Sequence, residues 1–238
     1  IISCASFDWP LVMDIDGDGF LEIVKFGKFW ITGYEWNGSV FMNLSDVEAS
    51  VLYETYLFGD YDLDGSKDLV VAGENGVYFV DPKTATTKYM IRVVSHDVRS
   101  DTFIAGDFDG DRAPEIAISF IDSGLYIVDP AEKWIRFLGR TYKNLNLAHI
   151  RAYPVDSDGD GVDELFFAIP SNGCVGLMDS YGNIRWVRIL SSLNVTNGSQ
   201  GGPFSPALIR HIRRVRVGDF DNDGDYEAVF TTDTSEIY

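Results

Sequence analysis

Apolar and β-branched residues occur along this chain in short runs that are separated by turns rich in Gly, Asn and Asp. Some of these runs lead into an acidic segment, at residues 11–13, 56–58, 103–105 and 215–217. Others leave such a segment, at residues 22–24, 69–71, 115–118 and 165–167. Runs of this kind, bounded by turn residues, predict β-strands. No convincing amphipathic helical period interrupts them, so the pattern predicts an all-β protein.

Two further strands are predicted in each unit. Residues 77–82 and 125–130 are near copies of one another, and each ends in Asp-Pro. Fourth strands follow polar turns, as at residues 88–93 and 134–138. The acidic segments begin at residues 14, 60, 107, 156 and 219, which places them 46, 47, 49 and 63 residues apart. A repeat of about 40–50 residues that contains four strands is typical of a β-propeller blade.

The repeat predicts one β-propeller domain over residues 1–238, with blades near residues 7–51, 52–98, 99–147, 148–209 and 210–238. The extra length before the fifth acidic segment lies in residues 191–206, which are rich in Ser, Asn and Gly and predict an exposed loop. The last unit reaches only its second strand and the start of a third, at residues 236–238. We therefore expect four complete blades and a partial fifth, from a processed or truncated piece of a seven- or eight-bladed ring.

Each acidic segment has the pattern Asp-x-Asp-x-Asp-x-x-x-Asp/Glu, with carboxylates at positions 1, 3, 5 and 9. Such spacing turns oxygen ligands inward on a common centre, as a hard divalent cation requires. The predicted ligands are the side chains of Asp14, Asp16, Asp18, Glu22, Asp60, Asp62, Asp64, Asp68, Asp107, Asp109, Asp111, Glu115, Asp156, Asp158, Asp160, Glu164, Asp219, Asp221, Asp223 and Glu227.

The alternative for these loops is an aspartate-rich turn that caps its own amides. Four carboxylates within nine residues repel one another unless a cation neutralises them, which favours the metal. The absence of Cys and His from the pattern disfavours zinc, and magnesium prefers smaller, more hydrated sites. We expect up to five Ca²⁺ ions with a structural role, because a closed shell of protein oxygens leaves little room for a substrate.

The repeats resemble the FG-GAP repeats of integrin α-subunit propellers and the similar VCBS-type repeats of microbial surface proteins. Residues 59–65, 106–111 and 218–224 carry the resemblance. It implies that each loop joins the innermost strand of a blade to the next strand. It also implies a fifth ligand, the backbone carbonyl at position 7, which here belongs to Phe20, Ser66, Ala113, Val162 and Asp225.

Position 6 of the loop is normally Gly, because the sharp turn favours a positive φ. Gly19, Gly65, Gly161 and Gly224 follow this rule, whereas the third loop has Arg112. A residue other than Gly costs roughly 1 kcal/mol in the left-handed region. The third site, Asp107 to Glu115, is therefore predicted to be the weakest.

The chain has 37 acidic and 19 basic residues, a formal net charge of −18. This charge argues against nucleic-acid binding, which needs a broad basic face. No apolar run approaches the length of a membrane-spanning helix. Cys4 and Cys174 are interpreted as small buried hydrophobic residues, with a disulfide, internal or to an absent part of the chain, as the alternative.

Four glycosylation sequons, at Asn37, Asn43, Asn194 and Asn197, fall on predicted turns or loops. Their number favours an exported glycoprotein, so we expect an extracellular or cell-surface location.

Other groups carry weaker signals. His96, His149 and His211 lie in the predicted linkers and have no spacing that builds a catalytic triad. The basic cluster at residues 210–216 is interpreted as ion-pairing with acidic loops, with an anionic ligand near the central channel as the alternative. The tryptophans are interpreted as packing between blades rather than as a sugar-stacking platform: Trp9, Trp30, Trp36, Trp134 and Trp186.

The expected function is that of a calcium-stabilised extracellular propeller that binds a protein or carbohydrate ligand, or that has a surface-structural role. We expect no catalytic residues. The alternative is the propeller of a calcium-dependent polysaccharide lyase similar to rhamnogalacturonan lyase. A closed five-bladed, lectin-like ring is disfavoured because the fifth blade lacks strands.

Overall fold

A computed structural model of the chain describes residues 11–15, 18–27, 30–34, 40–44, 56–73, 76–84, 86–93, 102–142, 145–169, 174–189, 212–218, 220–221 and 227–232. These residues form β-strands, turns and one 3₁₀ turn. The described residues include no helix long and apolar enough to cross a membrane.

Four antiparallel sheets of four strands follow one another along the chain, and each runs in simple meander order. The first contains β1 (Leu11–Met13), β2 (Glu22–Gly27), β3 (Trp30–Tyr34) and β4 (Val40–Leu44). The second contains β5 (Tyr56–Gly59), β6 (Asp68–Gly73), β7 (Gly76–Asp81) and β8 (Thr86–Arg92). The third contains β9 (Phe103–Gly106), β10 (Glu115–Phe120), β11 (Gly124–Asp129) and β12 (Trp134–Gly139). The fourth contains β15 (Arg151–Val155), β16 (Glu164–Ile169), β17 (Cys174–Met178) and β18 (Ile184–Ile189).

Smaller elements connect and extend these sheets. A short hairpin, β13 (Thr141–Tyr142) and β14 (Leu145–Asn146), leads into the 3₁₀ turn η1 (Leu147–His149). The side chain of Asn146 caps this turn by accepting the Ala148 N–H. The pair β19 (Ile212–Gly218) and β20 (Glu227–Thr232) forms a two-stranded sheet at the C-terminal side. The four-stranded sheets have the form of propeller blades, and the predicted all-β class is confirmed.

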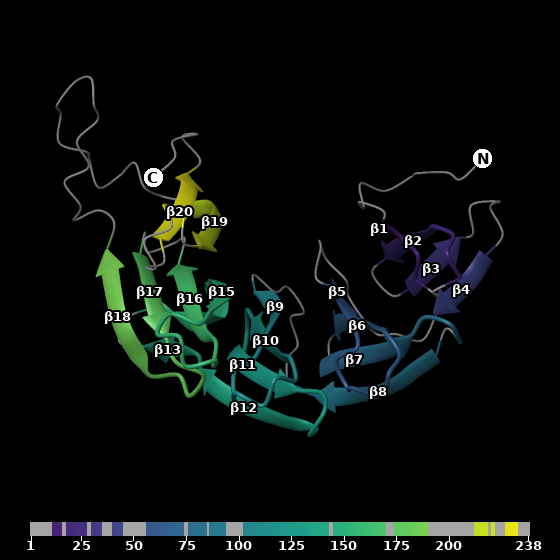
Figure 1. Ribbon diagram of the computed structural model, residues 1–238, viewed down its shortest axis with the longest axis horizontal. Coiled ribbons are helices and arrows are strands. Elements are labelled where there is room, and N and C mark those ends of the chain that lie inside the picture. Colours follow the sequence, from purple (N-terminus) through teal and green to yellow (C-terminus); the bar gives the residue numbers. More distant parts are fainter. Residues whose placement is uncertain are drawn as a thin grey trace, which may run out of the picture.

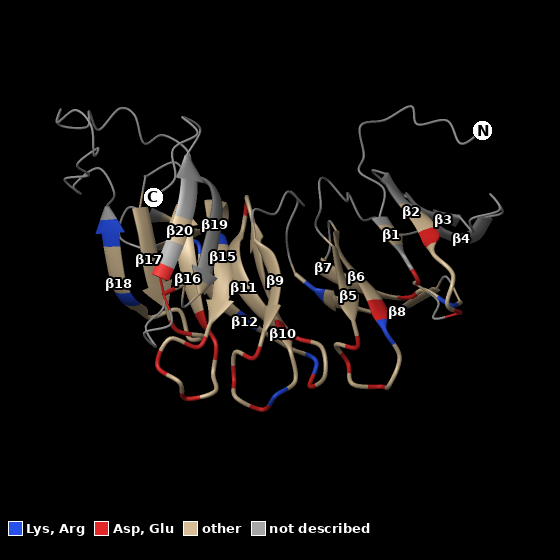
Figure 2. Ribbon diagram, turned by 45° about the horizontal axis from the view of Figure 1, so that its top comes forward, with Lys and Arg blue, Asp and Glu red and all other residues tan. Residues whose placement is uncertain are grey.

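The sheets are arranged along an open arc in chain order, with the first strand of each on the concave side (Figure 1). Strand β9 contacts β5 on one side and β15 on the other, and β15 also contacts β19. Each first strand passes into its second through an acidic loop, and the described loops project from one edge of the arc (Figure 2). A set of similar loops therefore shares one face of the molecule.

The second strand of a sheet is buried on both faces, because it lies between two neighbouring sheets. All six residues of β6, β10 and β16 are buried. Since successive side chains of a strand point to opposite faces, β10 supplies two separate cores. Ile116, Ile118 and Phe120 pack towards the second sheet, and Ala117 packs towards the fourth.

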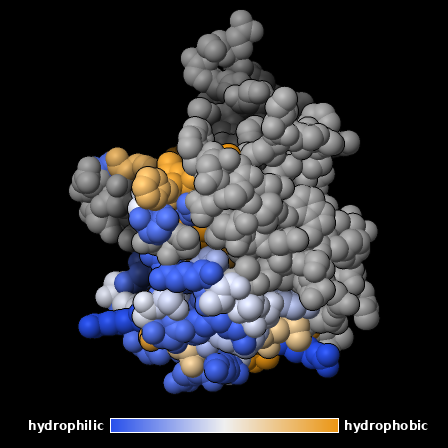
Figure 3. Space-filling view, turned by 90° about the vertical axis from the view of Figure 1, so that its right-hand side faces the viewer, coloured by the Kyte–Doolittle hydropathy of each residue, from blue (hydrophilic) through white to orange (hydrophobic). Residues whose placement is uncertain are grey.

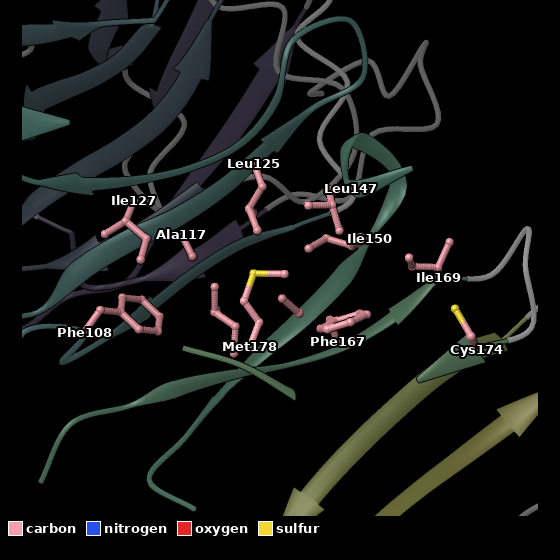
Figure 4. Close-up of a cluster of buried hydrophobic side chains, with 12 residues drawn as sticks. Phe108, Ala117, Leu125, Ile127, Leu147, Ile150, Phe167, Ile169, Cys174 and Met178 are labelled. Atoms are coloured by element: carbon pink, nitrogen blue, oxygen red, sulfur yellow. The ribbon is translucent and has the colours of Figure 1, made fainter. Parts of the chain in front are cut away.

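The core between the third and fourth sheets is shown in Figure 4. Phe108, Leu125 and Ile127 from the third sheet and its loop meet Phe167 and Met178 from the fourth. Each of these side chains is fully buried. Burial of such residues contributes roughly 1.5–3 kcal/mol each, so inter-sheet packing is a main source of stability.

The surface seen from the side of the N-terminal sheets is largely hydrophilic over the described residues, with scattered apolar side chains (Figure 3). Exposed large hydrophobic residues are found on several elements and do not come from one strand: Val12, Phe20, Leu21, Leu63, Ile135, Phe137, Tyr181, Trp186 and Phe220. Apolar residues scattered in this way are ordinary for a protein surface.

The strands predicted from the apolar runs are confirmed, with ends shifted by up to three residues. One sequon was misplaced, because Asn43 lies in β4 and not in a turn. Of the other sequence candidates in this part, Trp134 packs against the core between the third and fourth sheets, as expected, whereas Trp186 is 38% exposed. Candidates outside the described residues are Cys4, Trp9, Trp36, Asn37, His96, Asn194, Asn197, Arg210, His211 and residues 236–238.

Candidate metal centres

We name the acidic loops by their order: first (residues 14–22), second (60–68), third (107–115), fourth (156–164) and fifth (219–227). In four of them the carboxylate at position 9 folds back under the loop and accepts the N–H at position 2. The bonds are Ile15 to Glu22 at 2.8 Å, Phe108 to Glu115 at 2.6 Å, Ser157 to Glu164 at 2.9 Å and Phe220 to Glu227 at 2.9 Å. Position 9 also begins the second strand, so the strand fixes this carboxylate beneath the loop.

The carboxylate at position 1 accepts the N–H at position 6, which closes the turn. The bonds are Gly19 to Asp14 at 3.0 Å, Gly65 to Asp60 at 3.1 Å, Arg112 to Asp107 at 3.0 Å and Gly161 to Asp156 at 3.0 Å. The residue at position 6 has a positive φ in all four loops, as predicted. Arg112 adopts φ 72°, so the third loop has the expected strained residue.

In three loops the structure brings three of the four predicted carboxylates together, and Asp68, Asp111 and Glu164 lie outside these sets. In each of these loops, three residues place one carboxylate oxygen each within 4.8 Å of the other two. The sets are Asp60, Asp62 and Asp64; Asp107, Asp109 and Glu115; and Asp156, Asp158 and Asp160. A divalent ion at the centre of such a group contacts several oxygens at once, and oxygen ligands suit Ca²⁺. The sequence therefore identified these three clusters correctly as groups able to hold a metal ion.

The third loop has a buried carboxyl group, and no salt bridge among the described residues reaches it. Glu115 is fully buried, and its Oε1 has no hydrogen-bond partner, although Oε2 accepts the Phe108 N–H. Burial raises the pKa of Glu115 to about 8, and repulsion from Asp109 and Asp129 adds to the rise against the opposing Phe108 bond. A buried oxygen without a partner, next to two further carboxylates, fits a cation ligand.

The second loop holds a basic side chain where the carboxylates converge. Lys88 from β8 places its Nζ 2.9 Å from Asp62, 2.6 Å from Asp64 and 2.9 Å from Asp68. Burial raises the pKa of Asp68 to about 6, against the opposing bond from Lys88. Burial of Lys88 favours its neutral form, but the three carboxylates outweigh this and hold its pKa above the ordinary lysine value.

The fourth loop is contacted in a similar way by Arg185 from β18. Its Nη1 lies 2.8 Å from Asp158 and its Nη2 lies 2.7 Å from Glu164. The bond from Arg185 lowers the pKa of Asp158. Glu164 is also held by the Ser157 hydroxyl and N–H through its other oxygen. This loop is therefore charge-compensated on one side.

The first and fifth loops are only partly described. Asp14, Asp18 and Glu22 lie in the described part of the first loop, and Glu22 is fully buried. Asp16, Asp219, Asp223, Gly224 and Asp225 lie outside the described residues. Ion binding by these two loops stays a prediction, as it does for the other three. Ligation by the position-7 carbonyls also stays a prediction, for Phe20, Ser66, Ala113, Val162 and Asp225.

The third and fourth loops are joined to each other. Asp163 accepts the Asp107 N–H through Oδ2 at 2.9 Å, and its own N–H donates to the Asp107 carbonyl at 2.6 Å. A groove of about 220 Å³ lies between the two loops and the β17–β18 turn. It is lined by Asp109, Asp160 and the exposed ring of Tyr181, among others. Such a lining suits a cation or a polyhydroxylated ligand better than an anion.

Sequence reasoning missed three charged residues at these loops: Lys88, Arg185 and the buried Asp129. Each lies on a later strand of the sheet, outside the nine-residue pattern. The repeated Asp-Pro at the end of the third strand was a signal for Asp129, but no local pattern marks the two basic residues. The basic cluster at residues 210–216 falls partly in β19, where the side chains are not described, so its proposed ion pairs stay untested.

No family model matches the chain, and no curated protein matches it. The fold is similar to several solved structures. The Vibrio cholerae biofilm matrix protein Bap1 has a TM-score of 0.52 at 20% identity, over 76% of this chain and 28% of that one. A lectin from Agrocybe aegerita, described as recognising non-reducing terminal N-acetylglucosamine, has a TM-score of 0.54 at 15% identity, over 93% and 60%.

The structure of BBS1N in complex with ARL6DN has a TM-score of 0.50 at 12% identity, over 96% of this chain and 64% of that one. The chain thus spans between about a quarter and two thirds of the length of these three proteins. At such identities the likeness shows the fold alone, which is an all-β fold of the β-propeller type.

Proposed function

We propose that the chain is part of an extracellular β-propeller that Ca²⁺ stabilises through its acidic loops, and that presents a binding or structural surface. The third loop carries this proposal, because the buried Glu115 has an oxygen without a hydrogen-bond partner and forms one cluster with the carboxylates of Asp107 and Asp109. Without a cation, ionising this buried carboxyl is unfavourable, and burial together with the neighbouring carboxylates accordingly raises the pKa of Glu115. An ion with oxygen ligands removes that penalty.

Calcium removal tests the structural role. A ligand that binds only the folded state, at a free concentration one hundred times its Kd, stabilises a protein by about 2.7 kcal/mol per site. For a chain of this size that corresponds to a rise in melting temperature of about 5–10 °C. We expect circular dichroism melts to show at least this difference between excess calcium and excess EGTA. An unchanged melting temperature in EGTA would refute structural calcium.

For the surface role, we propose a carbohydrate as the ligand. A lectin and a biofilm matrix protein are among the similar folds, which supports this class without identifying a sugar. On the chain itself, the groove between the third and fourth loops offers carboxylates together with the Tyr181 ring, which is 69% exposed. Carboxylates accept hydrogen bonds from hydroxyl groups, and aromatic rings provide a flat apolar contact.

A glycan array probed with the calcium-loaded protein, followed by calorimetry, tests this role. Tyr181→Ala is expected to lose binding, whereas the more distant exposed Phe20→Ala is expected to retain it. Unchanged glycan binding by Tyr181→Ala would contradict this groove as the binding site. The lyase alternative is tested in the same samples, since a lyase releases unsaturated products from acidic polysaccharides and a binding module leaves them intact.

The remaining parts of the proposal concern the whole protein. We propose that the four four-stranded sheets and the β19–β20 pair belong to a seven- or eight-bladed ring. Secretion with N-glycans at Asn37, Asn43, Asn194 or Asn197 belongs to the same proposal. Expression through a eukaryotic secretory pathway, followed by enzymatic deglycosylation, would show a mass decrease for each occupied site, and no decrease would remove glycosylation from it.

A further inference from the structure

Two of the sheets carry a basic residue at the same kind of β-bulge. The pairing of β7 with β8 shifts by one residue, which leaves Lys88 without a cross-strand partner. The pairing of β17 with β18 shifts in the corresponding place, which leaves Arg185 without one. A bulge turns the extra residue away from the regular alternation of the strand and aims its side chain elsewhere. Here both side chains reach the acidic loop of their own sheet.

The contacts of these residues are with predicted metal ligands. The Lys88 ammonium lies within 2.9 Å of three of the four carboxylates of the second loop. The Arg185 guanidinium bridges two carboxylates of the fourth loop, at 2.8 Å and 2.7 Å. The Lys88 side chain is only 19% exposed, so its charge is directed into the loop and away from solvent.

The third sheet lacks this device. Its register is regular at the corresponding place, where Arg136 of β12 pairs directly with Ile127. The Arg136 guanidinium lies over the rings of Trp134 and Tyr181, at 4.7 Å and 4.4 Å from their centroids. In the described part of the chain, no salt bridge reaches the third loop.

Instead, a further carboxylate approaches the third loop. Asp129, at the end of β11, is fully buried, and its Oδ2 has no hydrogen-bond partner. Burial is the main cause of the raised pKa of Asp109, and the charge of Asp129 contributes to it. The third loop therefore has a further carboxyl group beside it, and among the described residues it has no basic partner like the Lys88 of the second loop.

We propose that Lys88 and Arg185 are tethered cations that take the place of a metal ion in the second and fourth loops, so that the third loop binds calcium most tightly of the three. This inference rests on the proposed calcium binding. An ion entering the second loop must displace the ammonium from three carboxylates, whereas an ion entering the third loop meets none. One unit charge at such distances in a partly buried site changes affinity by about tenfold or more.

This order differs from the one expected from Arg112. Its left-handed backbone is already present in this structure at φ 72°. Strain that is the same before and after an ion binds lowers the stability of the loop but leaves the affinity for the ion unchanged. The charge difference between the loops, in contrast, acts on the binding step itself.

Calorimetric titration with calcium alone tests the proposal on the metal-free chain. We compare wild type with Lys88→Met, which keeps the length and removes the charge, and with Lys88→Arg, which keeps the charge. Lys83→Met, an exposed lysine in the β7–β8 turn, is the matched control. Lys88→Met is expected to gain affinity of about tenfold or more at one site, while the other two variants remain within about threefold of wild type.

Two double variants locate the effect, and each adds a second substitution to Lys88→Met. Adding Asp62→Asn is expected to abolish the gain in affinity and to spare the tightest wild-type site. Adding Asp109→Asn is expected to remove that tightest site. If Lys88→Met folds only in calcium while wild type also folds without it, the tethered-cation role is supported as well.

Two results would overturn the inference. Unchanged calcium affinity in a folded Lys88→Met variant would overturn it while leaving the proposed calcium binding intact, since wild type still binds. Calcium binding by none of the proteins would overturn both.

Discussion

Glu115→Gln isolates the electrostatic role of the third loop, because it removes the buried titratable group and keeps the shape of the side chain. The glutamine carbonyl can accept the Phe108 N–H that Glu115 accepts at 2.6 Å. Its amide group then takes the place of the carboxylate oxygen that has no partner. The NH₂ can donate towards the neighbouring carboxylates, so the variant relieves repulsion instead of creating a new unsatisfied group.

The magnitude follows from the pKa of Glu115, which burial raises from 4.5 to about 8 in the absence of metal. A folded-state pKa above the unfolded value means that the folded protein holds its proton longer. The contribution to stability is therefore complete below pH 4.5 and is lost as the pH rises towards 8. At 1.36 kcal/mol per unit, metal-free wild type loses up to about 3 kcal/mol between pH 4.5 and 7.

Glutamine does not titrate, so Glu115→Gln is expected to avoid this loss. In metal-free buffer at pH 7 the variant should melt up to about 6–12 °C above wild type. In excess calcium the order should reverse, because the charged ligand stabilises the wild-type complex and the amide does not. At pH 5 without metal, the two proteins should differ much less than at pH 7.

Circular dichroism melts in both buffers measure this, with the exposed Glu132→Gln as a control of the same chemistry. Glu132→Gln is expected to shift neither melt by more than about 1–2 °C. A Glu115→Gln variant that is less stable than wild type in both buffers would refute the argument. Such a result would mean that this carboxylate stabilises the folded chain without an ion.

Three further predictions concern backbone, packing and thiol chemistry. Replacing Arg112, at φ 72°, by Gly should raise the free energy of unfolding by about 0.5–1 kcal/mol in a denaturant titration, and Ala should give no gain. Gly176→Ala should lower the free energy of unfolding by about 1–3 kcal/mol, because the new Cβ would lie 2.6 Å from the Phe167 ring. An unchanged denaturation midpoint would contradict this packing. The Cys174 thiol is fully buried, and burial raises its pKa. In a Cys4→Ser background, Cys174 should therefore react with a thiol reagent only when the protein unfolds. Rapid labelling of the native protein would contradict its buried position.

The loops were accessible from sequence because their structure is local. A carboxylate at position 1 reaches an amide five residues on, and position 9 reaches an amide seven residues back, as in Asp107 to Arg112 and Glu115 to Phe108. Gly19 and Arg112 both adopt the positive φ that the turn demands. The strands were also evident from the sequence, because each short apolar run predicts a strand that needs only a neighbouring strand to pair with.

The helical and hairpin details before β15 were not predicted. The 3₁₀ turn η1 is three residues long, too short to produce a periodic signal. Its Leu147 is buried and belongs to the core between the third and fourth sheets, so tertiary packing selects this turn. A sequence pattern that counts only local propensity has no access to that contact.

By itself, the sequence determined the all-β class, the repeated four-stranded unit and the grouping of carboxylates in each loop, because all of these depend on neighbours within a few residues. Only the tertiary structure decided which loops are neutralised. Lys88 lies 20 residues after Asp68, and Arg185 lies 27 residues after Asp158. Their charges reach the loops because a one-residue register shift aims them there, and strand register depends on the packing of whole sheets.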